Sequence, residues 1–120
     1  MKTNTKLYEV DHDDGVRCVK IADELLITCG GRIIKVWKSK NGKLLKKILL
    51  SDYCYNVHLN PDRTLLAVAY QKGVLIWNFS NYTLIKEIQI GPVYDAKFND
   101  LGTKVIFGEY DGELYKVDLY

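Results

Sequence analysis

The protein has 120 residues, of which 48% are hydrophobic and 27% charged, and a formal net charge of +2. This composition is typical of one globular domain and excludes a disordered or collagen-like chain. The nearly balanced charge does not indicate a dedicated nucleic-acid-binding protein. The longest apolar runs are shorter than the roughly 20 residues of a membrane helix, and residues 1–6 lack the apolar core of a signal peptide. We therefore expect a soluble, cytoplasmic protein with no nucleic-acid partner and no membrane span.

The three cysteines, Cys18, Cys29 and Cys54, form an odd set, and no two of them have the CxxC spacing. Such a set predicts neither a disulfide framework nor a zinc site. We expect free thiols, no bound metal and no cofactor.

Short runs rich in Val, Ile, Leu, Tyr and Thr, separated by Gly, Asn and Asp, predict strands along the whole chain. In chain order the expected strands are 6–10, 16–21, 25–29, 33–38, 43–49, 54–59, 65–70, 73–79, 83–90, 93–98, 104–109 and 113–119. Asn41-Gly42 is typical of a hairpin turn, and Asn60-Pro61-Asp62 is typical of another turn, because Pro and Asp both favour turn conformations. The sequence therefore predicts an all-β protein.

An internal repeat organises these strands. Trp37, Trp77 and Val117 are spaced by 40 residues, and the segment 44–48 (LLKKI) recurs at 84–88 (LIKEI). Four strands at this period are the sequence signature of a propeller blade. Because so small a sheet cannot bury both faces alone, successive sheets stack on one another. We expect β-propeller blades, three four-stranded antiparallel sheets per chain, making half of a six-bladed ring.

Residues 60–69 (NPDRTLLAVA) and 73–78 (GVLIWN) resemble the first turn, the second strand and the tryptophan-bearing third strand of a repeat of the WD-repeat β-propeller family. Residues 36–38 (VWK) occupy the same place one repeat earlier, and Asp111-Gly112 is similar to the family's turn before the third strand. The resemblance implies structural roles for His12, Trp37, Trp77, Asp111, Gly112 and Asp118. No repeat keeps the full Trp-Asp pair, so we expect the family's hydrogen-bond network to be incomplete in every blade.

The order of strands predicts how the chain is divided. We expect one three-blade unit over 1–120, with 6–10 as an isolated closing strand, 11–50 as repeat 1, 51–90 as repeat 2, and 91–120 as repeat 3 without its outer strand. Closed propellers have about four to eight blades, so three leave two open apolar faces. The leading hypothesis is a homodimer in which strand 6–10 of each copy completes the last blade of the other. The alternative is that the chain is a piece of a longer propeller.

Catalytic motifs are absent from the sequence, and His12 and His58 are its only histidines. An acidic loop at Asp11, Asp13 and Asp14 leaves open a metal-binding or enzymatic propeller. A basic cluster at Lys38, Lys40, Lys43, Lys46 and Lys47 leaves open a lipid-headgroup or nucleic-acid binder, although lysines at such a place more often protect a sheet edge.

In the family that this sequence resembles, partner peptides dock on the rim formed by two sets of loops, those between repeats and those before each third strand. The resemblance places on that rim Arg17, Arg32, Tyr53, Tyr55, Tyr70, Lys72, Tyr94 and Tyr110, together with Asp13, Asp14 and Asp111. Tyr and Arg are enriched in binding hot spots, because each offers a large contact area with a polar group. The sequence therefore predicts a non-enzymatic scaffold for protein–protein interaction.

Overall fold

The computed structural model describes residues 15–109 and 111–119, and every regular element in these ranges is a β-strand. The strands are β1 (Cys18–Ala22), β2 (Leu25–Gly30), β3 (Ile33–Lys38), β4 (Leu44–Leu49), β5 (Cys54–Leu59), β6 (Leu65–Tyr70), β7 (Gly73–Asn78), β8 (Thr83–Gln89), β9 (Val93–Phe98), β10 (Lys104–Glu109) and β11 (Leu114–Asp118). All of them were expected from the sequence. The expected strand 6–10 lies outside the described residues.

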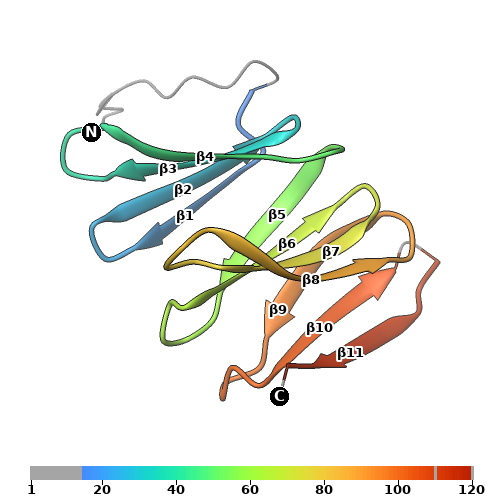
Figure 1. Ribbon diagram of the computed structural model, residues 1–120. Coiled ribbons are helices and arrows are strands. Elements are labelled where there is room, and N and C mark those ends of the chain that lie inside the picture. The colour runs from blue at the N-terminus through green and yellow to red at the C-terminus, as the bar shows by residue number, and fades with distance from the viewer. Residues whose placement is uncertain (1–14, 110, 120) are drawn as a thin grey trace, which may run out of the picture.

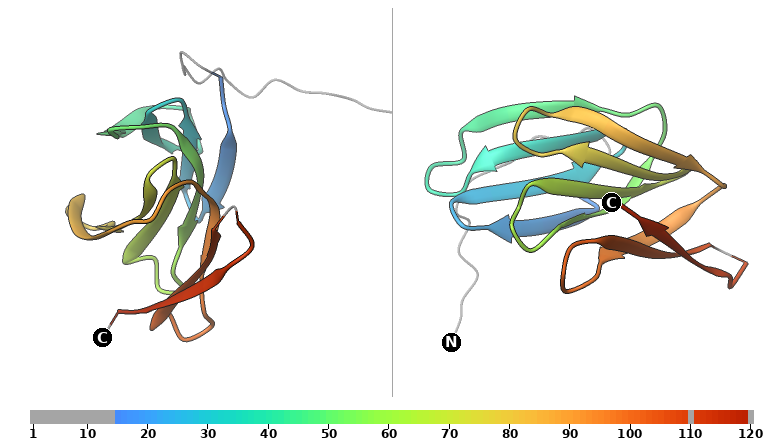
Figure 2. Two further views of the ribbon diagram at one scale, coloured as in Figure 1. Left: turned by 90° about the vertical axis from the view of Figure 1, so that its right-hand side faces the viewer. Right: turned by 60° about the horizontal axis from the view of Figure 1, so that its bottom comes forward.

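The strands form three antiparallel sheets in which neighbours along the chain pair with each other. The sheets have the orders β1-β2-β3-β4, β5-β6-β7-β8 and β9-β10-β11. The second sheet lies between the first and the third (Figure 1), and the left view of Figure 2 shows the same succession from the blue and green strands at the top to the red strands at the bottom. The predicted all-β fold of propeller blades is confirmed. The third sheet has three strands among the described residues, so its completion by 6–10 stays a prediction.

Two tight turns of the same design connect β5 to β6 and β9 to β10. In the first, Asn60 Oδ1 accepts hydrogen bonds from the backbone N–H groups of Thr64 and Leu65, both at 2.9 Å. In the second, Asn99 Oδ1 accepts from those of Thr103 and Lys104 at the same distance. One side-chain oxygen thus replaces the missing backbone partners of the turn, which is the reason for Asn at this place.

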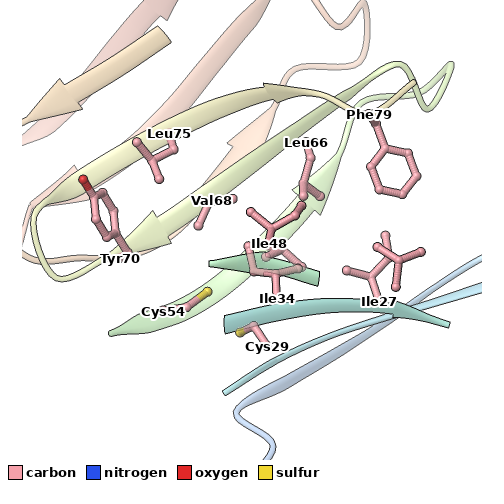
Figure 3. Packing of buried hydrophobic residues seen from close by; sticks show 12 residues of the cluster. Ile27, Cys29, Ile34, Ile48, Cys54, Leu66, Val68, Tyr70, Leu75 and Phe79 are labelled. Carbon is pink, nitrogen blue, oxygen red and sulfur yellow. The ribbon is translucent and has the colours of Figure 1, made fainter. Parts of the chain in front are cut away.

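The apolar core forms two layers, one between each pair of adjacent sheets. The first layer includes Ile27, Ile34 and Ile48 from the first sheet, packed against Leu66 and Val68 from the second (Figure 3). The second layer lies between the second and third sheets, and its buried members are Ala67, Ala69, Val74, Ile76, Val93, Ala96, Phe98, Val105 and Phe107. Because alternate residues of β6 enter different layers, the second sheet is buried on both faces, which explains its continuous apolar sequence.

The connections between strands lie at two opposite rims, because consecutive antiparallel strands reverse direction. One rim, which we call the tyrosine rim, contains the segment before β1 and the connections β2–β3, β4–β5, β6–β7, β8–β9 and β10–β11. The first strands of adjacent sheets are neighbours, β5 contacting both β1 and β9. The tyrosine rim therefore brings together loops from all three sheets.

Candidate functional site

A pocket of about 440 Å³ opens on the tyrosine rim between the first and second sheets. Its lining residues, which define the rim pocket, are Val16, Arg17, Gly31, Tyr53, Cys54 and Tyr55. The backbone fixes this place, because Cys54 N–H donates to Gly31 O and Leu50 N–H donates to Arg32 O, both at 2.8 Å. The β4–β5 loop is thus attached to the β2–β3 turn, and the two segments together form one wall of the pocket.

Two arginines of the rim each lie against a tyrosine ring. The Arg17 Cζ atom is 5.2 Å from the centre of the Tyr55 ring, and Arg32 Cζ is 5.1 Å from the centre of the Tyr53 ring. These are cation–π distances, at which the ring attracts the guanidinium while leaving its N–H groups accessible. The structure therefore brings together four of the rim residues that the sequence predicted.

A second aromatic contact extends the cluster toward the third sheet. The rings of Tyr55 and Tyr94 have centroids 4.7 Å apart and are tilted by 59°. The Tyr55 hydroxyl donates a hydrogen bond to Gln71 Oε1 in the β6–β7 turn, which fixes the phenol. Tyr94 is 51% exposed and Tyr53 is 47% exposed, so both present an aromatic face to solvent.

Two other predicted rim residues, Tyr70 and Lys72, do not join this cluster. Tyr70 was expected on the surface, but it is only 1% exposed and belongs to the first core layer, because it shares a face of β6 with Leu66 and Val68. Its hydroxyl donates to Glu87 Oε2 at 3.1 Å, and burial together with this bond raises its pKa. Lys72 donates to Ser51 Oγ at 3.3 Å beside the pocket. Tyr110 lies outside the described residues.

The fold and the rim can be compared with solved structures. The chain superposes on the WD40 repeats of RRP9 with a TM-score of 0.83 at 16% identity, over 92% of this chain and 37% of that one. The chain superposes on the structure of U3-55K with a TM-score of 0.83 at 15% identity, over 92% of this chain and 38% of that one. For the C-terminal WD40 domain of Sif2 the TM-score is 0.82 at 18% identity, over 99% of this chain and 38% of that one.

These blades have the WD-repeat propeller fold. The chain spans less than two-fifths of the length of the structures it matches, and the identities are low enough that the likeness concerns the fold. No protein-family model and no curated protein matches the sequence.

The two tryptophans of the WD-repeat blades occupy equivalent positions with different partners. Trp37 Nε1 donates to Thr28 Oγ1 at 2.9 Å inside the first blade. Trp77 Nε1 is buried without a hydrogen-bond partner, since the residue 40 positions after Thr28 is Val68. His12, to which the family resemblance assigns a structural role, lies outside the described residues.

The turn expected at Asp111 and Gly112 lies between β10 and β11 in the third sheet. Gly112 has a φ of 96°, and its N–H donates to Glu109 O at 3.0 Å. Asp111 Oδ1 accepts from the Glu113 N–H at 3.2 Å, which closes the β10–β11 turn. Asp118, at the end of β11, lies 3.6 Å from Lys104 Nζ. Asp111 and Asp118 are both exposed, so their contacts stabilise only the surface of this blade.

A larger hollow, of about 820 Å³, lies at the opposite rim of the blades. It is lined by Ala22, Asp23, Glu24, Leu25, Arg63, Phe79, Ser80 and Tyr82. Its arginine already has a charged partner, since Arg63 forms an ion pair with Asp23. The rim pocket differs because its arginine, Arg17, contacts a tyrosine ring.

The three cysteines and the one histidine among the described residues lie between adjacent sheets. Cys18, Cys29 and Cys54 are free thiols, and the Sγ atoms of Cys18 and Cys29 are 2.8 Å apart across β1 and β2. His58 Nδ1 accepts a hydrogen bond from the Phe98 N–H at 3.1 Å, which joins β5 to β9. Within residues 15–109 and 111–119 no group of three or more His, Cys, Asp or Glu side chains is arranged to hold a metal ion. The described part of the chain also contains no helix with the length and hydropathy of a membrane span.

Proposed function

We propose that the protein is a non-enzymatic scaffold that binds a protein partner through the tyrosine rim. The observation that carries the proposal is the cluster of Arg17, Arg32, Tyr53, Tyr55 and Tyr94, of which Arg17, Tyr53 and Tyr55 line the rim pocket. Buried or stacked Tyr and Arg provide much of the binding energy in protein interfaces, because they combine large area with hydrogen-bonding groups. The WD-repeat fold supports this function, since WD-repeat domains generally bind proteins. The free thiols agree with an intracellular location.

The test is the loss of a defined partner when the exposed rings are removed. A partner that co-purifies with the protein is identified by cross-linking and mass spectrometry, and its affinity is then measured as a purified protein. Tyr53→Ala and Tyr94→Ala should each weaken binding at least about tenfold, as expected for hot-spot aromatics. The matched control is Leu101→Ala, which removes an 82% exposed side chain from the β9–β10 turn at the opposite rim. Equal affinity for all three variants would contradict the proposal.

Ring closure is the second part of the proposal, and it rests on the outer faces of the first and third sheets. Ile21, which alternates with residues facing the core, is 76% exposed, and Leu114 is 79% exposed on the third sheet. Val19 and Ile106 are also exposed on these two faces. Exposed apolar faces of stacked repeats need a covering partner. We propose that a second copy supplies it, so that two chains close a six-bladed ring.

The mass of the protein in solution tests ring closure. Light scattering should give about 28 kDa, twice the chain mass of 13.8 kDa, as a closed two-fold assembly requires. Ile21→Lys and Leu114→Lys should each shift this mass toward that of the single chain, whereas Leu101→Lys, on a turn, should leave it unchanged. A stable species at 13.8 kDa in the unaltered protein would contradict ring closure by a second copy. It would favour the alternative that further blades of a longer chain complete the ring.

A further inference from the structure

Arg17 of the rim pocket and the neighbouring Arg32 differ from the cations that form ion pairs among the described residues. Arg63 pairs with Asp23, Lys97 with Asp95, and Lys104 with Asp118. Among residues 15–109 and 111–119, neither Arg17 nor Arg32 lies within salt-bridge distance of a carboxylate. Both are exposed. Among the described residues, therefore, Arg17 at the rim pocket and Arg32 beside it on the Tyr53 ring have no carboxylate partner.

The tyrosine rings hold these guanidinium groups in place without using their donors. A guanidinium that rests on a ring face keeps its N–H edge free, and this edge matches the two oxygens of a carboxylate. The contact also restricts the rotamers of the long arginine side chain before a ligand arrives, which reduces the entropy lost on binding. The guanidinium groups of Arg17 and Arg32 are thus positioned to donate hydrogen bonds to an anion.

The acidic side chain next to Tyr53 forms no ion pair with either arginine. Asp52 Oδ1 accepts a hydrogen bond from the Tyr53 N–H at 2.8 Å and so serves the local backbone. Lys72 adds a third cation at the same end of the rim, where it bonds to the Ser51 hydroxyl. The carboxylates of the β10–β11 connection, Glu109 and Glu113, both accept from the Tyr115 hydroxyl at the third sheet. Among the described residues, the tyrosine rim therefore carries more cations than carboxylates at the pocket, and carboxylates gather at the third sheet.

We infer that the rim pocket and the adjoining Arg32 bind an acidic peptide segment of the partner, with Glu or Asp carboxylates held by Arg17 and by Arg32. This inference rests on the proposed function and specifies its ligand. A pocket of about 440 Å³ accommodates one side chain and part of its neighbours. Apolar residues beside the carboxylate would contact Val16 and the exposed Tyr53 ring. Charge complementarity of this kind governs which partner is accepted more than how tightly it is held.

Fluorescence anisotropy with a synthetic probe tests the inference directly. The probe is a labelled peptide of alternating Glu and Leu, compared with the same peptide carrying Gln and with one carrying Lys in place of Glu. The Glu peptide should bind at least about tenfold more tightly than the Gln peptide, because a charged acceptor strengthens the hydrogen bonds to arginine. Its affinity should fall with salt, since exposed charges are screened.

Variants of the protein assign the effect to the pocket. The double variant Arg17→Gln with Arg32→Gln should lose at least about tenfold in affinity for the Glu peptide, and Arg32→Lys alone should lose part of it, because an ammonium does not form the planar double hydrogen bond. Lys43→Gln with Lys46→Gln removes the same charge from β4 and the turn before it, and should change the affinity less than about twofold.

Equal losses in the arginine and lysine variants, or equal binding of the Glu and Gln peptides, would overturn the inference. The proposed function is tested separately, by the affinity of the purified partner for the tyrosine variants. If Tyr94→Ala weakens partner binding but Arg17→Gln with Arg32→Gln does not, the proposed scaffold function is supported and the acidic ligand is excluded.

Discussion

Trp37 donates its indole N–H to Thr28 Oγ1 at 2.9 Å, and the equivalent indole of the next blade, Trp77, has no partner. The two sites share the same register, since Thr28 pairs with Lys35 and Leu26 with Trp37, while Val68 pairs with Leu75 and Leu66 with Trp77. The difference therefore comes from one atom, the hydroxyl of Thr28 against a methyl group of Val68. A buried donor without an acceptor costs about 1–3 kcal/mol.

Val68→Thr should raise the free energy of unfolding by about 1 kcal/mol, because the new hydroxyl is placed to accept from Trp77 Nε1. Threonine has nearly the shape of valine, so the core layer needs no repacking. Urea unfolding followed by tryptophan fluorescence measures the change in midpoint.

Two variants complete this experiment. Val68→Thr in a Trp77→Phe background should give no gain, since no indole N–H is left to donate. The reverse change, Thr28→Val, should lower stability by at least about 1 kcal/mol, because it leaves Trp37 Nε1 without this acceptor. A gain that persists with Trp77→Phe would show that the hydroxyl acts through another contact.

The sequence predicted the strands well, because alternation, turn residues and the period of 40 all act locally or repeat. It predicted the rim less well. Tyr70 was assigned to the surface by its place near a turn, although its alternation with Leu66 and Val68 indicates the core. β5 has an irregular register between Cys54 and Asn56, so alternation does not tell where Tyr55 points. The contact of Arg17 with Tyr55 depends on the packing of two sheets, which no local pattern contains.

Gly73→Ala should unfold or strongly destabilise the protein. Gly73 has a φ of 145°, and a Cβ added there would lie 1.9 Å from the Ile88 backbone oxygen in β8. The backbone of a paired strand cannot move aside, so we expect a loss of at least about 3 kcal/mol. The residue 40 positions earlier, Ile33, is not among those with positive φ, which explains why a large side chain fits there. Urea unfolding provides the measurement.

Gly112→Ala is the control for this clash. Gly112 also has a positive φ, of 96°, but a Cβ there meets nothing within 4 Å. Gly112→Ala should lower the free energy of unfolding by only about 1–2 kcal/mol, which is the cost of the backbone conformation alone. Similar losses in the two variants would mean that conformation, rather than the contact with Ile88, determines the need for glycine.

The contact between His58 and Phe98 should make stability depend on pH. Burial lowers the pKa of His58 below its ordinary value of 6.5, and Lys97 and Lys20 lower it further while Asp95 opposes them. The unfolded chain therefore binds a proton more readily than the folded one, so stability falls as the pH decreases from 6.5 through the lowered pKa. Protonation also removes the Nδ1 acceptor of the Phe98 N–H.

His58→Asn isolates this effect, since the amide oxygen takes the place of Nδ1 and does not titrate. We expect urea midpoints of the two proteins to agree near neutral pH and to separate below pH 6.5, the unaltered protein being the less stable. Parallel pH profiles would exclude His58 as the titrating group.

The thiols between the first two sheets should be unreactive in the folded protein. Hydrogen bonding to Cys29 and burial raise the pKa of Cys18 far above its usual range. At Cys29 the bond with Cys18 lowers the pKa, but the contact with Cys54 and burial outweigh it and raise the pKa to about 12. Because the thiolate is the nucleophile, Cys29 should react with iodoacetamide at pH 8 on the order of a thousandfold more slowly than an ordinary exposed cysteine.

Alkylation followed by peptide mass spectrometry tests this, with Ser51→Cys as an exposed reference thiol in the same molecule. The reference should be modified first, and Cys18 and Cys29 should react at its rate only after urea unfolds the chain. Both pKa values are raised, so the thiolate fraction stays small up to pH 8 and increases only in more alkaline solution. Modification of Cys29 in the folded protein as fast as the reference would mean that the sheets separate readily, since only exposure returns the thiol to its ordinary pKa.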